Sequence, residues 1–171
     1  MRRVRYSVVM SLDGYIAGPK GEADWITTDP EFDFAALFSQ FDTILVGRRT
    51  FEAMVKAERT SLPGMKTMVF SRTLRQEDYP EVAIVMESHR EALAALKTGP
   101  GKDIWLFGGG LLFQSLVQDG LVDTVEVGIV PIFLGGGIPL LPSLEKRIKL
   151  SLTGHQVRQT GMISLEYAIT C

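Results

Sequence analysis

Three glycines in a row, Gly108, Gly109 and Gly110, are the residues of this chain best suited to hold a phosphate group. They separate the apolar run 104–107, which predicts a buried strand, from apolar residues at helical spacing over 112–117. A strand that turns through glycines into a helix presents unpaired backbone N–H groups at the positive end of the helix dipole. Such an end binds phosphate, so the triplet predicts a seat for the pyrophosphate of a dinucleotide.

A second junction of this kind is Gly47-Arg48-Arg49-Thr50, which follows the apolar run 43–46. The glycine lets the backbone approach a ligand closely, while the arginines and the threonine hydroxyl add charge and a hydrogen-bonding group. Either junction alone could be an ordinary tight turn. Two of them in one small sheet favour a cofactor that is held from two sides.

The third candidate is Ser71 with Arg72, at the end of the predicted strand 66–70. A hydroxyl and a guanidinium at a strand end suit the additional 2′-phosphate of NADP(H). By itself, this pair is equally well interpreted as a solvated strand end.

The long first loop and the segment after it are rich in carboxylates. Asp13 precedes Trp25 in this loop, and Asp29 and Glu31 follow Trp25. Long glycine-bearing loops of this kind often cover active sites. Pro30 predicts the start of a helix, with Asp29 as its N-cap. Asp29 and Glu31 are also the candidate catalytic residues, because a carboxylate from this region could assist proton transfer beside a hydride acceptor.

Other chemistries find no support in the sequence. The triplet lacks the last glycine of GxGxxG, and neither GxxxxGK[ST] nor a GxSxG elbow occurs. The histidines are His89 and His155, and the single cysteine is Cys171, so we expect no metal site, disulfide or catalytic thiol. The formal net charge of −2 disfavours nucleic acid and acidic membranes as partners. No apolar run approaches the roughly 20 residues that span a bilayer, and we expect a cytoplasmic protein.

Strand and helix patterns alternate along most of the chain. Strands are predicted at 4–11, 43–46, 66–70, 82–86, 104–107 and 122–129, and helices at 30–41, 51–55, 90–97 and 112–117. Two alternating segments, 148–152 and 163–169, then predict an antiparallel hairpin. We therefore expect one α/β domain over residues 1–171, with a mixed, mostly parallel central sheet flanked by helices and an antiparallel C-terminal hairpin.

Four motifs, taken in order, resemble the dihydrofolate reductase-like family. They are Ser11–Ala17, Val46–Glu52, Pro63–Ser71 and Leu106–Gly110. The stretch Val130–Leu140, with a second glycine triplet, is similar to the reductase domain of bifunctional riboflavin-biosynthesis proteins, the RibD C-terminal domain. The resemblance covers nearly the whole chain, and it implies a dihydrofolate reductase-like fold, NADPH as cofactor and hydride transfer.

The resemblance also implies roles for individual residues. The expected contacts to the cofactor are Gly47, Arg48, Arg49, Thr50, Ser71, Arg72, Gly108, Gly109, Gly110, Leu111 and Leu112. In this family a cis peptide bond typically joins the first two glycines of the triplet. The loop 13–25 would cover the nicotinamide, with Asp13 and Trp25 on the substrate side.

Folate-reducing members carry a carboxylate on the first helix, at a register that falls on Pro30 in this chain, between Asp29 and Glu31. This departure favours a reductase that acts on 5-amino-6-(5-phosphoribosylamino)uracil or a related small heterocycle, with a dihydrofolate reductase as the alternative. A nucleotide-binding module without catalysis is the alternative of another class. We also expect a homodimer, formed through an edge strand among the last segments or through the apolar loop 129–141.

Overall fold

A mixed sheet of eight strands forms the centre of the protein, and the computed structural model describes residues 1–27, 29–86 and 88–170. The strands of this sheet are β1 (Val4–Ser11), β3 (Phe41–Gly47), β4 (Lys66–Phe70), β5 (Ala83–Val85), β6 (Asp103–Gly108), β7 (Thr124–Val130), β9 (Lys149–Val157) and β10 (Ile163–Thr170). Two short strands, β2 (Tyr15–Ala17) and β8 (Ile138–Pro139), pair in a separate sheet. The helices are α1 (Phe34–Ser39), α2 (Arg48–Lys56), α3 (His89–Thr98) and α4 (Gly110–Gln118), with a 3₁₀ turn at Gln76–Asp78. Within the described residues, no helix is long and apolar enough to cross a membrane.

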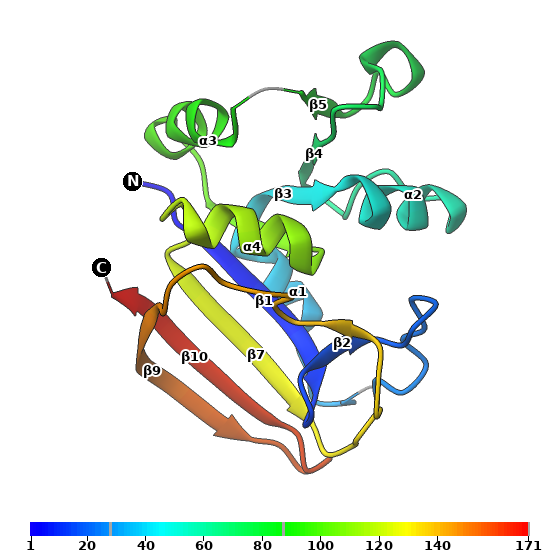
Figure 1. The fold of residues 1–171 in the computed structure, drawn as a ribbon, viewed down its shortest axis with the longest axis vertical. Coiled ribbons are helices and arrows are strands. Elements are labelled where there is room, and N and C mark those ends of the chain that lie inside the picture. Colours follow the sequence, from blue (N-terminus) through cyan, green and yellow to red (C-terminus); the bar gives the residue numbers. More distant parts are fainter. Residues whose placement is uncertain (28, 87, 171) are drawn as a thin grey trace.

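The strand order of the large sheet is β5-β4-β3-β6-β1-β7-β10-β9. Figure 1 shows the run β1-β7-β10-β9 side by side. All neighbours from β5 across to β7 are parallel, whereas β10 pairs antiparallel with both β7 and β9. The expected mostly parallel sheet with an antiparallel C-terminal hairpin is thus confirmed. Because the six strands from β5 to β7 are parallel, their carboxyl ends meet along one edge of the sheet.

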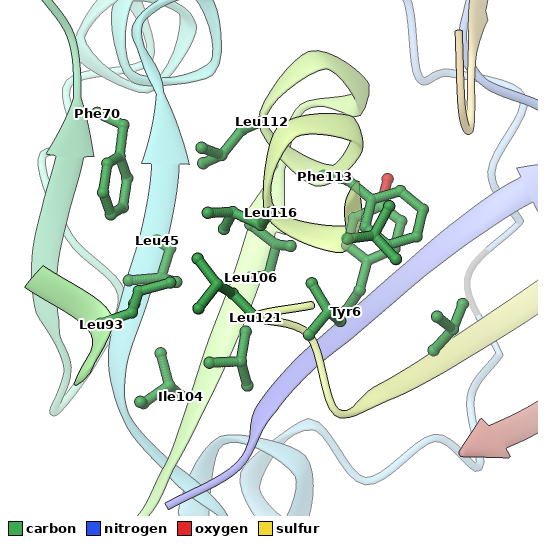
Figure 2. Close-up of a cluster of buried hydrophobic side chains, with 14 of the residues drawn as sticks. Tyr6, Leu45, Phe70, Leu93, Ile104, Leu106, Leu112, Phe113, Leu116 and Leu121 are labelled. Atoms are coloured by element: carbon green, nitrogen blue, oxygen red, sulfur yellow. The ribbon is translucent and has the colours of Figure 1, made fainter. Parts of the chain in front are cut away.

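Helices α3 and α4 cover one face of the sheet. Their apolar residues join residues of β1, β3, β6 and β7 in one buried cluster, part of which is shown in Figure 2. Phe113 of α4 stacks on Tyr6 of β1 with ring centroids 3.9 Å apart. Leu116 of α4 is fully buried beside Leu106 of β6. This packing fixes where α4 starts and which way its first turn faces.

Helices α1 and α2 cover the opposite face. Phe51 of α2 is fully buried there with Val46 of β3, and Trp105 of β6 packs beside Phe38 of α1, with ring centroids 5.8 Å apart. The central strands are therefore buried on both faces, which explains why their sequences read as continuous apolar runs rather than as alternating ones.

The first helix is shorter than predicted, and the prediction of its cap was wrong. The N-cap of α1 is Asp33, which accepts a backbone N–H of the first turn at 2.8 Å. Asp29 instead lies buried in the preceding turn, where it accepts the N–H of Glu31 at 2.9 Å. The apolar spacing continued to Phe41 because this residue, although it begins β3, is buried in the same cluster that α1 packs against.

Strand β9 forms one edge of the large sheet and is exposed along nearly all of its length. Its apolar side chains Leu150 and Leu152 are 46% and 56% exposed. The expectation of a homodimer through the last strands stays a prediction. The β2–β8 pair was not predicted, because two or three residues within glycine-rich loops carry no readable periodicity.

Truncation of the α4 core is the first test of this architecture. We expect Leu116→Ala to lower the free energy of unfolding by about 2–5 kcal/mol, since it leaves a cavity under α4. Leu111→Ala on the same helix should change it by less than about 0.5 kcal/mol, because Leu111 is 61% exposed. Urea denaturation of both variants measures the difference. Equal losses would contradict the packing described for α4.

Candidate functional site

Strands β3 and β6 lie side by side but continue into helices on opposite faces of the sheet: α2 follows β3, and α4 follows β6. In open α/β sheets, ligands bind outside the carboxyl ends of the strands at such a switch point. Gly47 ends β3 and Gly108 ends β6, and the register pairs Val46 with Gly108. The structure thus brings together the two glycine junctions that the sequence singled out.

Backbone atoms of the two junctions approach each other closely. A Cβ atom on Gly47 would lie 3.8 Å from the carbonyl oxygen of Gly108 and 3.7 Å from Cβ of Leu112. A Cβ on Gly109 would come within 3.3 Å of Oγ1 of Thr50. The peptide bond between Gly108 and Gly109 is cis, as the family resemblance implied. The absence of side chains here leaves a surface of bare backbone between the starts of α2 and α4.

Both helix starts can bind an anion. Gly47 caps α2 and Gly109 caps α4, and neither helix has a side-chain cap. The first N–H groups of a helix have no acceptor within that helix, which applies to Arg48 to Thr50 in α2 and to Gly110 to Leu112 in α4. The positive ends of two helix dipoles therefore meet at this edge of the sheet.

A pocket of about 700 Å³ lies at the ends of the neighbouring strands β4 and β5. Its lining residues are Phe70, Ser71, Arg72, Val85, Met86, Ser88, His89 and Leu111. Leu111 belongs to the first turn of α4, so the pocket continues directly from the glycine triplet. Sequence reasoning missed His89 and Met86. His89 begins α3 and Met86 follows β5, and only the tertiary packing of these two elements brings both residues into one pocket with Arg72.

The two members of the Ser71–Arg72 pair are placed differently in this pocket. Ser71 is buried, and its hydroxyl oxygen accepts the N–H groups of Thr73 at 3.2 Å and Leu74 at 3.1 Å. That hydroxyl therefore shapes the turn after β4. Arg72 is exposed and lines the pocket, so it is the cation available to a bound phosphate.

Arg48 and Arg49 also remain available to a ligand. Arg48 is 47% exposed and lies 3.4 Å from Oε1 of Glu52, one turn further along α2. Such an exposed pair contributes little to stability, so the guanidinium can turn toward an anion at small cost. Arg49 is exposed as well.

The two candidate catalytic carboxylates lie against the tip of the β9–β10 hairpin. Oδ2 of Asp29 is 3.8 Å from Nε of Arg158, and Oε1 of Glu31 accepts a hydrogen bond from Gln159 at 3.3 Å. In the strand order, β10 is three positions from β6, which corresponds to roughly 14 Å along the sheet. Asp29 and Glu31 are thus at the edge formed by the carboxyl ends of the parallel strands but outside the glycine junctions, and their catalytic role stays a prediction.

The two residues expected on the substrate side belong to the loop after β1. Trp25 is partly buried, and its indole N–H donates to the carbonyl of Glu22 at 3.1 Å. The Asp13 carboxylate accepts three hydrogen bonds, one from Ser11 and two from the loop after β7. Its pKa is lowered, chiefly by the Ser11 hydroxyl and also by those backbone N–H groups. Contact of Trp25 or Asp13 with a substrate stays a prediction.

These residues fit a nicotinamide dinucleotide carrying a 2′-phosphate. Bare backbone and two helix starts suit the pyrophosphate, and the pocket around Arg72 is of a size to admit an adenosine moiety with its phosphate. Among the described residues, no group of three or more His, Cys, Asp or Glu side chains could hold a metal ion.

A methyl group at the start of α4 tests the close contacts of the triplet. A Cβ on Gly110 would lie only 2.8 Å from the carbonyl oxygen of Pro139. We expect Gly110→Ala to cost about 1–3 kcal/mol of stability, whereas Gly136→Ala, whose Cβ would meet nothing within 4 Å, should be nearly neutral. Thermal denaturation compares the stability of the two variants with that of the parent. An unchanged stability of Gly110→Ala would contradict the close contact between Gly110 and Pro139.

Comparison with known proteins agrees with this geometry. The family model of the RibD C-terminal domain matches residues 2–164. The uncharacterized protein YyaP of Bacillus subtilis is 34% identical, over 97% of this chain and 94% of that protein. A structure from Shewanella sp. PV-4, of a protein provisionally assigned to riboflavin biosynthesis, matches with 25% identity and a TM-score of 0.85 over 100% of both chains. Dihydrofolate reductase from Enterococcus faecalis, solved with NADP(H), shares the fold with a TM-score of 0.72 at 19% identity, over 99% of this chain and 97% of that chain. The chain belongs to the RibD C-terminal domain family and has the dihydrofolate reductase-like fold.

Proposed function

We propose that the protein is an NADPH-dependent reductase that transfers a hydride to a phosphoribosylaminopyrimidine or a related small heterocycle. One observation carries the proposal: both glycine junctions lie at the switch point between β3 and β6, and the pocket around Arg72 lies on the same edge of the sheet, at the ends of β4 and β5. Such an arrangement suits a long ligand that bridges several strand ends and carries phosphate groups at two separate positions.

The cofactor side of the proposal assigns each group a distinct task. The N–H groups at the starts of α2 and α4 bind the pyrophosphate, and Arg72 binds the 2′-phosphate. Arg48 and Arg49 add positive charge beside the pyrophosphate. When bound, NADPH supplies the hydride, and the chain contributes orientation and exclusion of water.

The substrate side rests on the family. Membership of the RibD C-terminal domain family supports a pyrimidine substrate. A Thermotoga maritima protein matches with 17% identity and a TM-score of 0.75, over 99% of this chain and 57% of its own, and it is named as a diaminohydroxyphosphoribosylaminopyrimidine deaminase and 5-amino-6-(5-phosphoribosylamino)uracil reductase. Asp29 and Glu31 are the candidates for proton transfer at this end.

Cofactor binding can be tested at Arg72. We expect Arg72→Ala to raise the Kd for NADPH about 10- to 100-fold, since it removes a charge-assisted hydrogen bond to phosphate. The Kd for NADH, which has no 2′-phosphate, should stay the same. Arg75→Ala is the matched control, because Arg75 is exposed nearby but does not line the pocket. Fluorescence titration measures the Kd for NADPH and for NADH in the parent and in both variants. Equal NADPH affinity in Arg72→Ala and Arg75→Ala would remove Arg72 from the site.

Substrate choice can be tested by following the loss of NADPH absorbance. We expect oxidation of NADPH with 5-amino-6-(5-phosphoribosylamino)uracil and none with dihydrofolate, because the position where the family resemblance expects the folate-binding carboxylate is Pro30, which lies in the turn before α1. Turnover of dihydrofolate alone would favour a dihydrofolate reductase. Tight binding of NADPH with no turnover of either compound would favour a nucleotide-binding module.

A further inference from the structure

The loop after β7, residues 131–142, forms a strap that is joined to the loop after β1. The N–H of Leu12 donates to the carbonyl of Ile132 at 2.9 Å, and the N–H of Leu140 donates to the carbonyl of Gly14 at 2.9 Å. The short strands β2 and β8 pair directly beside the second of these bonds. The strap and the loop after β1 therefore form one hydrogen-bonded unit.

Asp13 is the side chain that ties this unit together. Its Oδ1 accepts the N–H of Leu134 at 3.1 Å, and its Oδ2 accepts the N–H of Gly135 at 2.8 Å. The Ser11 hydroxyl donates to Oδ1 at 2.6 Å. Gly135 has a φ of 71°, a conformation that glycine adopts without strain, and this conformation turns the strap around the carboxylate.

The strap in turn rests on the start of α4. A Cβ on Gly110 would lie 2.8 Å from the carbonyl oxygen of Pro139 and 3.2 Å from that of Leu140. Both carbonyls belong to the part of the strap next to the β2–β8 pairing. A continuous path of contacts therefore leads from Asp13, through the strap, to the first turn of α4.

The Asp13 carboxylate has little capacity left for a substrate. An ionised carboxylate offers about four acceptor positions, and three hydrogen bonds already occupy this one. The Ser11 hydroxyl and the two strap N–H groups lower the pKa of Asp13, so the carboxylate is ionised at neutral pH and can accept all three.

We propose that Asp13 is a positioning residue for the cofactor: it holds the strap against Gly110 and so fixes the N–H groups at the start of α4 that bind the pyrophosphate. This inference rests on the proposed function. It differs from the expectation that Asp13 contacts the substrate, because it predicts an effect on cofactor affinity rather than on substrate affinity.

The test compares Asp13→Ala, Asp13→Asn, Gly135→Ala and the double variant Asp13→Ala/Gly135→Ala. We expect Asp13→Ala to raise the Kd for NADPH about tenfold, within the range that contacts acting through another element contribute. Gly135→Ala strains a residue with φ of 71° while leaving the carboxylate in place, and it should produce a similar loss. The double variant should be no worse than either single one, since both loosen the same strap. Asp13→Asn keeps one acceptor oxygen and should recover part of the affinity.

Gly136→Ala is the matched control, because a Cβ there would meet nothing within 4 Å, and we expect it to bind NADPH like the parent. A cooperative thermal denaturation transition is required of every variant, as the control that it is folded. A variant in which substrate KM rises while the Kd for NADPH is unchanged would overturn the proposal and return Asp13 to the substrate.

Amide hydrogen exchange of the unliganded protein provides a readout that does not depend on the proposed function. Asp13→Ala should speed exchange in residues 131–142 and in the first turn of α4, and Gly136→Ala should not. Unchanged exchange in both segments would overturn the inference even if the parent binds NADPH tightly. If the parent fails to bind NADPH, the proposed function fails and the role of Asp13 in cofactor binding falls with it, whatever the exchange shows of the strap.

Discussion

The pairing of β3 with β6 is the constraint on which the rest of the site depends. Val46 pairs with Gly108, so the two strands end together at one edge of the sheet. The helices that follow carry their apolar residues to opposite faces, Phe51 to one cluster and Leu116 to the other. Two helix starts therefore remain at the same edge, and their dipoles favour an anion between them. Glycine at the strand ends keeps this space free, since a Cβ on Gly47 would already contact Gly108 and Leu112.

The glycine triplet is held from a second direction by chain that is distant in sequence. The strap 131–142 lies against Gly110, and Asp13 joins the strap to the end of β1. A phosphate site built from backbone N–H groups is useful only if those groups are held in place before the ligand arrives, because ordering them on binding would cost free energy. The strap gives the first turn of α4 that support through the contact of Pro139 and Leu140 with Gly110.

Parts of the fold could be predicted because, in those segments, the pattern of apolar residues along the chain agrees with the faces that the structure buries. Continuous apolar runs marked β3, β4 and β6, which are buried on both faces, and the alternating end of the chain marked the hairpin. The first helix was misjudged because Asp29 and Asp33 are equally good caps by residue type. The difference between them comes from the hairpin tip, where Arg158 lies beside the buried Asp29, and no local pattern places that tip beside residue 29.

Residue patterns along the chain were enough to predict the alternation of strands and helices, the two glycine junctions, the Ser71–Arg72 pair and the family resemblance. Each of these depends on short motifs or periodic runs whose residues are near one another along the chain. The three-dimensional fold was needed to show that Gly47 lies beside Gly108, that His89 and Leu111 share a pocket with Arg72, and that Asp13 binds the strap. The reason is that strand order and loop contacts join residues tens of positions apart, and many different orders would satisfy the same local periodicity.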